Sequence, residues 1–363
     1  MNPRGVSALG WRLAETIRRD GPISVADFMT AALTDPTDGY YTTRDPLGAG
    51  GDFVTSPEIS QVFGEIVGVW CAELWRRMGE PAHFVLAELG PGRGTLMTDL
   101  LRALAVLPAC AAAAELHLVE LSPTLRAAQA AALARRHPGR IVVWHDRAET
   151  LPPGPLLLIA NEFLDALPIR QWHHTGGRWT ERCIGLDAAG AFAFVAGPTA
   201  APPPGAPPAP ADGAIFETNE VASTLAEALG GRLTATGGAA LLIDYGHAKS
   251  GFGDTLQAVK GHGYAPVLAD PGTADLTAHV DFAAVARAAG QAGARSHGPV
   301  TQHRFLIANG IEQRLARLEA GCDIATGARL RQGVRRLIDP QEMGRLFKVM
   351  ALTDASLTDL PGF

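Results

Sequence analysis

The sequence has few cysteines, few aromatic residues and no excess of basic residues. Four cysteines occur among 363 residues, and aromatic residues make up 6% of the chain. The cysteines form no CxxC pair, which argues against a thiolate zinc site and against a dense disulfide framework. The 37 acidic residues outnumber the 31 basic ones, whereas a nucleic-acid-binding surface normally shows a basic excess. We therefore expect reduced thiols and no bound nucleic acid.

Long apolar runs are also missing. The longest window without a charged residue, Ala188–Ala211, contains seven prolines, which a membrane-spanning helix would not hold. Residues 1–21 mix arginines with Glu15 and Asp20 and lack the apolar core of a secretory signal. We expect no membrane insertion and a cytoplasmic location, or the mitochondrial matrix if the chain comes from a eukaryote.

Metal-binding arrangements of histidine are missing too. None of the 11 histidines belongs to an HExxH motif. The adjacent His173 and His174 cannot both face one ion from a regular strand, because successive side chains point to opposite sides. We predict no metal site.

Short apolar runs alternate with longer helical stretches from Phe84 onward. This βαβα order, with nearly all-apolar strands, is typical of a parallel sheet that helices cover on both faces. We predict an α/β fold with a Rossmann-like, mostly parallel sheet. The predicted strands are residues 83–90, 116–122, 140–146, 155–163 and 239–246, with two further candidates at 294–302 and 346–353, and the helices of this part are 95–107, 123–136 and 281–292.

The chain is long enough for about two domains, or for one large domain with insertions. We predict an N-terminal helical extension at 1–80 and a sheet domain at 81–352. Within the extension, helices are expected near 9–17 and 58–78, with a polar loop at 35–57 between them. The apolar face of the second helix includes Val69.

Two insertions are expected in the sheet domain, one near 168–215 and a helical one near 310–340. In the first, strands near 169–173 and 179–184 are predicted to turn at Gly176-Gly177. The proline-rich stretch Gly197–Gly213 that follows is expected to be an extended, exposed loop.

A glycine-rich turn follows the first predicted strand of the sheet. The segment ELGPGRGT places Glu88 before Gly90, Pro91, Gly92 and Gly94, at the start of a helix. Glycines let a ligand approach the backbone, and the helix N-terminus offers free N–H groups. An acid at this place would repel a pyrophosphate, but it can bind the ammonium of S-adenosylmethionine (SAM). The alternative is that Glu88 caps a turn.

Acids also stand at the ends of the next two strands. Glu120, followed by Leu121, is placed to hold the two hydroxyls of a ribose. Asp146 is placed to accept from an adenine amino group. A surface ion pair for Glu120 and a helix cap for Asp146 are the alternatives.

The fourth strand ends in Asn161-Glu162, with Asp165 close behind. Ligands of open α/β sheets lie beyond the carboxyl ends of the strands, so these residues should face the donor methyl group. Carboxylates can fix a guanidinium bidentately and accept its proton. We predict that Glu162, Asp165 and Asn161 hold the methyl acceptor, and that Asn161 also contacts the methyl donor, SAM. The alternatives are an N-cap for Asp165 and a structural role for Glu162.

His247 follows the fifth strand and is a further candidate for the acceptor pocket, although a lone histidine is more often a structural hydrogen-bonder. The segment 48–58 is predicted to close over the donor, with Thr55, Ser56 and Pro57 among the donor-binding residues. Ser56 is expected to cap the following helix, with Pro57 at its first position.

The ordered blocks of this sequence resemble the MidA-like SAM-dependent methyltransferases. The resemblance spans about residues 10–352, and the proline-rich loop departs from it. It implies a seven-stranded methyltransferase sheet, SAM as cofactor and a protein substrate. Mitochondrial members of that family are complex I assembly factors and protein-arginine methyltransferases. The blocks are GDFVTSPEISQVFGE, ELGPGRGTLMTDLLR, HLVELSPTLRAAQ, ANEFLDALPIRQW, LLIDYGH, PGTADLTAHVDF, TQHRFLIANGI and EMGRLFKVMAL.

Three functions are compared for the chain. The first is methylation of a protein arginine, with a subunit of NADH:ubiquinone oxidoreductase as a candidate substrate. The second is a non-catalytic, SAM-binding assembly factor for a respiratory complex. The third, a nicotinamide-dependent oxidoreductase, is the least favoured, and it would bind NAD but not S-adenosylhomocysteine. A homodimer is a further expectation, and the sequence does not identify the acceptor protein or the methylation product.

Overall fold

The computed structural model describes residues 7–43 and 55–363. Its contacts divide the chain into two compact units, which we call the first unit and the sheet unit. The first unit comprises Met1–Phe53, Leu164–Leu225 and His247–Val285, and the sheet unit comprises Val54–Phe163, Ala226–Gly246 and Ala286–Phe363. No helix within the described ranges is long and apolar enough to cross a membrane.

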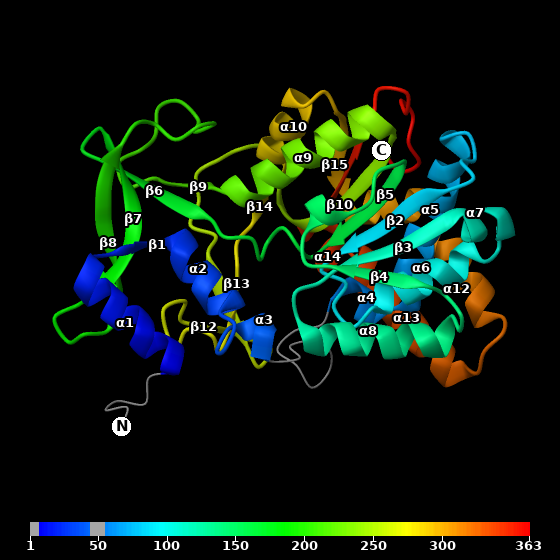
Figure 1. Cartoon of the computed structure of the whole chain (residues 1–363), viewed down its shortest axis with the longest axis horizontal. Helices are drawn as coiled ribbons and strands as arrows, with labels where there is room; N and C mark the ends of the chain where they lie inside the picture. Colours follow the sequence, from blue (N-terminus) through cyan, green and yellow to red (C-terminus); the bar gives the residue numbers. More distant parts are fainter. Residues whose placement is uncertain (1–6, 44–54) are drawn as a thin grey trace. The chain divides into compact units, whose positions relative to one another are not determined.

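The sheet unit is built on one twisted sheet with the strand order β15-β16-β10-β5-β2-β3-β4 (Figure 1). The pairs from β10 to β4 are parallel, whereas β16 runs antiparallel to both β10 and β15. The predicted α/β fold and all seven predicted strands are confirmed. Their bounds are β2 Phe84–Leu89, β3 Ala114–Val119, β4 Val142–His145, β5 Leu156–Asn161, β10 Gly238–His247, β15 Arg295–Thr301 and β16 Phe347–Thr353.

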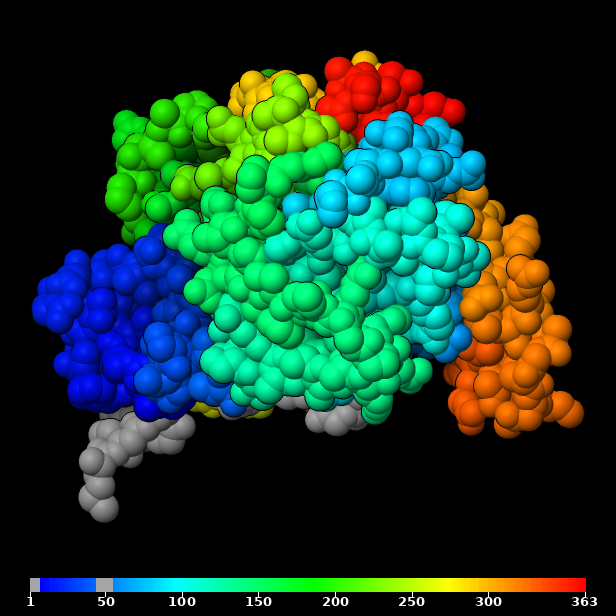
Figure 2. Space-filling model, turned by 45° about the vertical axis from the view of Figure 1, so that its right-hand side comes forward, coloured from blue at the N-terminus to red at the C-terminus, as the bar shows by residue number. Residues whose placement is uncertain are grey.

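Burial explains why these runs form central strands. Every residue of β2 and β5 is buried, so both faces of these strands need apolar side chains. The helices of this unit are α4 Ser56–Ile59, α5 Gln61–Arg77, α6 Thr95–Leu104, α7 Pro108–Ala113, α8 Pro123–Arg136, η1 Ala148–Thr150, α11 Gln302–Ala308, α12 Ile311–Glu319, α13 Ile324–Ile338 and α14 Met343–Leu346. Helices α12 and α13 lie at the surface (Figure 2).

Helix α5 packs closely against α6 because two of its positions have no side chain. A Cβ on Gly68 would lie 2.6 Å from the carbonyl oxygen of Leu100, and one on Gly64 would lie 2.7 Å from Cβ of Asp99. This packing joins α5 to the sheet unit, whereas the sequence-based division places residues 58–78 in the N-terminal extension.

The predicted helix 58–78 is wrong in its first turn. The chain is extended at Ser60, with φ −157°, and the Ser60 hydroxyl accepts a hydrogen bond from the N–H of Val62 at 3.3 Å. Serine at this position therefore ends α4 and caps α5. Ser56 is not the N-cap of α4, because Thr55 takes that place. Pro57 was expected at the first helical position, but it is the second residue of this helix. Val69 was expected on the buried face but is 49% exposed.

The predicted helix 95–107 is also too long. Helix α6 ends at Leu104, and a separate helix, α7, begins at Pro108. Proline is favoured in the first turn of a helix and disfavours helical geometry in the residue before it, so the chain breaks at Leu107.

The first unit contains helices α1 and α2 and a five-stranded antiparallel sheet (Figure 1). The predicted hairpin is confirmed, because β6 pairs with β7 around Gly176-Gly177, both with positive φ. The elements of this unit are α1 Ala8–Asp20, β1 Ile23–Ser24, α2 Val25–Thr34, α3 Tyr40–Thr43, β6 Arg170–Thr175, β7 Arg178–Leu186, β8 Phe192–Ala200, β9 Ile215–Thr218, β11 Gln257–Lys260, β12 Gly263–Ala265, β13 Asp275–Thr277 and β14 Val280–Asp281, with α9 Glu220–Thr236 and α10 Phe282–Gln291 continuing into the sheet unit.

The expected proline-rich loop begins later than predicted, because Gly197–Ala200 belong to β8, in which Thr199 and Ala200 pair with β7. A strand is possible there since Pro198 lies toward the edge of the sheet, where an N–H is not needed. Four features of the structure were not predicted from the sequence: β8, β9, the three-stranded sheet of β11–β13 and the helix α9.

Candidate functional site

The glycine-rich turn lies between β2 and α6 and depends on left-handed backbone. Gly90, Gly92 and Gly94 have φ values of 60°, 54° and 79°, which glycine adopts at little cost. A Cβ on Gly90 would lie 2.8 Å from Cδ2 of Phe163. The turn therefore contacts the residue that follows Glu162, and it excludes side chains at its first position. Pro91 is buried within the turn.

Glu88 is a buried acid at the end of β2, with 3% of its surface exposed. Burial, with the nearby charge of Glu120, raises its pKa to about 8, against a smaller opposing effect of a hydrogen bond from the N–H of Met97. Its Oε2 atom has no hydrogen-bond partner among the described residues. A buried carboxyl oxygen of this kind fits a cationic ligand group, such as the ammonium of SAM.

Glu120 is the second buried acid, and it follows β3. Its Oε1 accepts from the N–H of Ser122 at 2.8 Å, and its Oε2 accepts from Nε2 of Gln129 at 3.2 Å. Burial raises its pKa, against the lowering effect of these hydrogen bonds. Because Glu120 is only 9% exposed, the alternative of a surface ion pair does not apply.

Asp146 and Leu121 lie at the same edge of the sheet but are exposed. Asp146 Oδ1 is 2.5 Å from Nη2 of Arg126, and Nε of the same arginine donates to the carbonyl of Glu120 at 2.7 Å. Arg126 thus connects the ends of β3 and β4. The N-cap of η1 is Arg147, so Asp146 does not take the capping alternative.

Glu162 follows β5 and has a left-handed backbone, with φ 51°. Its Oε1 accepts from the N–H of Ser56 at 2.7 Å and from Nδ2 of Asn161 at 3.1 Å. The two flanking amides are held from β10: the N–H of Glu162 donates to the carbonyl of Ile243 at 2.8 Å, and that of Phe163 donates to Asp244 at 3.1 Å. The unusual conformation is therefore fixed from both sides.

Two further buried polar atoms belong to this cluster. Ser56 Oγ and Asn161 Oδ1 have no hydrogen-bond partner within the described part of the chain. Their residues both donate to Glu162, so the structure brings Ser56, Asn161 and Glu162 together. Thr55 and Pro57 flank Ser56, and residues 48–54 of the predicted closing loop lie outside the described residues.

Asp165 and His247 belong to the first unit. Asp165 is 6% exposed, and its carbonyl accepts from the N–H of Ala278 at 3.0 Å. No helix follows Asp165, so it is not an N-cap. His247 Nδ1 is 2.7 Å from the carbonyl oxygen of Lys249, which is the structural contact named as its alternative.

Sequence reasoning did not select Gln129 or Asp244 as site residues. Gln129 is fully buried. In the sequence it is marked only as a polar amide among the alanines and leucines of the helix that follows Glu120. Asp244 is 1% exposed and was visible as an acid near the end of a strand. No cluster of three metal-binding side chains occurs in residues 7–43 and 55–363.

Comparison with known proteins decides the family. Residues 66–300 match the Methyltransf_28 family of S-adenosyl-L-methionine-dependent methyltransferases. The chain belongs to this family. The enzyme is thus a methyltransferase, and its cofactor is SAM.

Its relatives cover nearly the whole chain. It is 38% identical to the zebrafish protein "Protein arginine methyltransferase NDUFAF7, mitochondrial", over 95% of this chain and 86% of that protein. The human protein of the same name is also 38% identical, over 93% of this chain and 81% of its own length. A Burkholderia thailandensis protein solved with bound S-adenosyl-homocysteine has a TM-score of 0.86 and 31% identity, with 98% of this chain and 94% of that chain covered.

Proposed function

We propose that this methyltransferase transfers the methyl group to a guanidinium nitrogen of an arginine in a protein. The similar animal proteins are named as protein arginine methyltransferases, which supports arginine as the acceptor. The resemblance to complex I assembly factors favours a subunit of NADH:ubiquinone oxidoreductase as the substrate protein. A cytoplasmic location and a homodimer remain predictions.

The observation that carries the proposal is the conformation of Glu162. A left-handed backbone is uncommon for a residue with a side chain, and such outliers concentrate at functional sites. Two donors, Ser56 N and Asn161 Nδ2, hold Oε1 of this carboxylate. A carboxylate held at the carboxyl end of a central strand is suited to orient a guanidinium, which matches it with two parallel N–H groups.

The donor site in this proposal is the turn between β2 and α6 with the acids on either side of it. Glu88 binds the ammonium, Glu120 the ribose hydroxyls and Asp146, with Leu121, the adenine. Gly90, Pro91, Gly92 and Gly94 leave room for the ligand, and Asn161, Thr55, Ser56 and Pro57 complete its surroundings. The unpartnered buried atoms of Glu88, Ser56 and Asn161 support this assignment, because buried polar atoms normally have partners.

Bound SAM supplies an electrophilic methyl group on a sulfonium. Glu162 orients the attacking nitrogen and excludes unproductive rotations of the acceptor. Methylation of a guanidinium releases one proton, and the Glu162 carboxylate is placed to accept it. Asp165 and His247 are proposed as further groups for the acceptor.

The test is methyl transfer from labelled SAM to extract of cells that lack this protein, with mass spectrometry of the labelled band. A methylated arginine is the expected product. Label on another residue type would refute arginine specificity. Binding of S-adenosylhomocysteine without transfer to any protein of the extract would favour the non-catalytic assembly factor instead.

A further inference from the structure

One fully buried amide side chain connects three consecutive strands of the sheet. Gln129 lies on α8 with no exposed surface. Its Nε2 donates to the carbonyl of Gly92 at 2.7 Å and to Oε2 of Glu120 at 3.2 Å. Its Oε1 accepts from the indole Nε1 of Trp144 at 2.8 Å. The partners belong to the turn after β2, to the end of β3 and to β4.

These three contacts fix the orientation of the amide. An indole N–H can only donate, and carbonyl and ionised carboxylate oxygens can only accept. The NH₂ group of Gln129 must therefore face Gly92 and Glu120, and its oxygen must face Trp144. Both donor hydrogens are used, so glutamine provides what neither glutamate nor an apolar residue of equal length would provide.

We propose that Gln129 is a positioning residue for the donor site: it holds the Glu120 carboxylate and the Gly92 turn in the geometry that binds SAM. The proposal rests on the donor site proposed above. Gln129 and the N–H of Ser122 each hold one oxygen of Glu120, which fixes the plane of this carboxylate. Gly92 has a φ of 54°, and glycine changes its backbone conformation easily. The hydrogen bond to the Gly92 carbonyl therefore stabilises this conformation of the turn.

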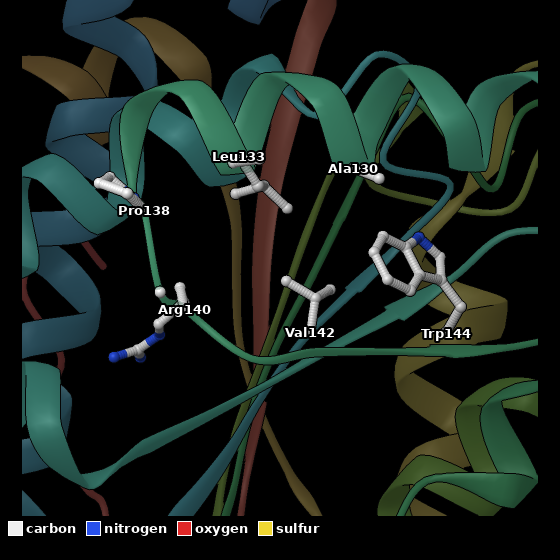
Figure 3. Close-up of a pocket in the computed structure, with 8 residues that line it drawn as sticks. Ala130, Leu133, Pro138, Arg140, Val142 and Trp144 are labelled. Atoms are coloured by element: carbon white, nitrogen blue, oxygen red, sulfur yellow. The ribbon is translucent and has the colours of Figure 1, made fainter.

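Trp144 extends the arrangement to the edge of the sheet. It lines a cavity of about 290 Å³ between α8 and β4, together with Leu133, Val142 and Arg140. Figure 3 shows the Trp144 ring beneath α8, with its nitrogen turned toward the helix. Because one side of the ring faces this cavity, the hydrogen bond to Gln129 contributes to its orientation. The indole N–H in turn keeps the Gln129 amide from rotating.

The experiment measures the dissociation constant for S-adenosylhomocysteine by calorimetry in five variants of the full chain. Gln129→Met keeps the length of the side chain and removes its polar atoms. Gln302→Met is the matched control, because Gln302 is also fully buried and donates through Nε2 to a carbonyl, that of Leu337, at 2.9 Å. Trp144→Phe removes the donor to Gln129 together with part of the ring, and Val142→Ala controls for lost packing in the same cavity.

Gln129→Met should raise the dissociation constant by about tenfold or more, the loss expected for a hydrogen bond to a charged group. The KM for SAM should rise with it, while kcat at saturating SAM is kept. Gln302→Met should lower the melting temperature and leave the affinity unchanged. Trp144→Phe should weaken binding by about threefold or more relative to Val142→Ala, as for a weaker, indirect contact.

Unchanged affinity in Gln129→Met overturns the proposal, as does an equal loss in Gln302→Met. If Gln129→Met does not fold, an affinity of Trp144→Phe equal to that of Val142→Ala overturns it. Glu120→Ala distinguishes a failure of the proposed donor site from a failure of the role proposed for Gln129. If Glu120→Ala binds S-adenosylhomocysteine like the unchanged protein, the donor site itself is misplaced. If it loses affinity and Gln129→Met does not, only the role of Gln129 fails.

Discussion

The backbone N–H of Ser56 donates to Oε1 of Glu162 across 2.7 Å, although the two residues are 106 positions apart in the sequence. The bond joins the segment before α5 to the end of β5. The segment that was predicted to lie at the donor therefore also holds the carboxylate that we propose for the acceptor.

Glu162→Gln should retain affinity for S-adenosylhomocysteine and slow methyl transfer. An amide keeps the size of the side chain but cannot form a charge-assisted pair worth about 1.5–3 kcal/mol, which corresponds to about 10- to 150-fold in rate. Single-turnover transfer to the acceptor protein measures the effect. The exposed Glu149 provides the control, Glu149→Gln, which should react normally. Transfer at the unchanged rate would assign Glu162 a structural role.

Gly92→Val should abolish binding of S-adenosylhomocysteine, because a branched side chain at φ 54° strains the turn and enters the ligand's space. Gly139 is a matched control: it has φ +82°, and a Cβ added there would meet nothing within 4 Å. Gly139→Val should lose stability through backbone strain but still bind. Calorimetry with circular dichroism distinguishes the two results, and full affinity in Gly92→Val contradicts the donor site.

The pKa of about 8 for Glu88 predicts a pH-dependent affinity. Below that pH the carboxyl is mostly protonated, and only its ionised form attracts an ammonium. The ionised fraction, and with it the affinity for S-adenosylhomocysteine, should rise by up to about tenfold per pH unit between pH 6 and 8. Glu88→Gln should bind like the unchanged protein at pH 6 and more weakly at pH 8.

The comparison of Glu88→Gln with the unchanged protein provides its own control. Glu120, whose pKa is also raised, is present in both proteins, so the difference between their pH profiles reports Glu88 alone. Parallel profiles would show that Glu88 does not contact the donor. The same raised pKa predicts that stability without ligand falls as the pH rises from the ordinary glutamate value toward 8, because the unfolded state ionises first.

Asp244→Asn should slow methyl transfer without weakening donor binding. The two carboxylate oxygens of Asp244 accept from the N–H groups of Phe163, at 3.1 Å, and of Tyr245, at 2.9 Å. Asparagine offers one acceptor oxygen, so one of these partly buried N–H groups loses its partner, at a cost of about 1 kcal/mol. The left-handed turn at Glu162 should then relax. Thermal unfolding and kcat measure the two effects, and an unchanged kcat in a destabilised protein would contradict the positioning role.

The order of apolar runs and acids along the chain was enough to predict the sheet and the places of its acids. The nearly all-apolar runs of β2 and β5 are buried along their whole length, as is typical of central strands of a parallel sheet. Acids at or just after the ends of such runs lie at the carboxyl edge of the sheet. Glu88, Glu120 and Glu162 were therefore predictable, and so was a glycine turn that needs positive φ.

The partner of each site side chain depends on how the helices and strands pack, and it could not be predicted from the sequence. The break at Ser60, the contacts of Gln129 with three strands and the hold of Asp244 on the Phe163 amide all join residues that no local pattern relates. Propensity and periodicity describe neighbours along the chain, whereas these hydrogen bonds depend on the distances between packed elements. For the same reason the N-cap alternative for Asp165 was wrong, since no helix follows it, and Val69, which was expected on the buried face of its helix, is 49% exposed.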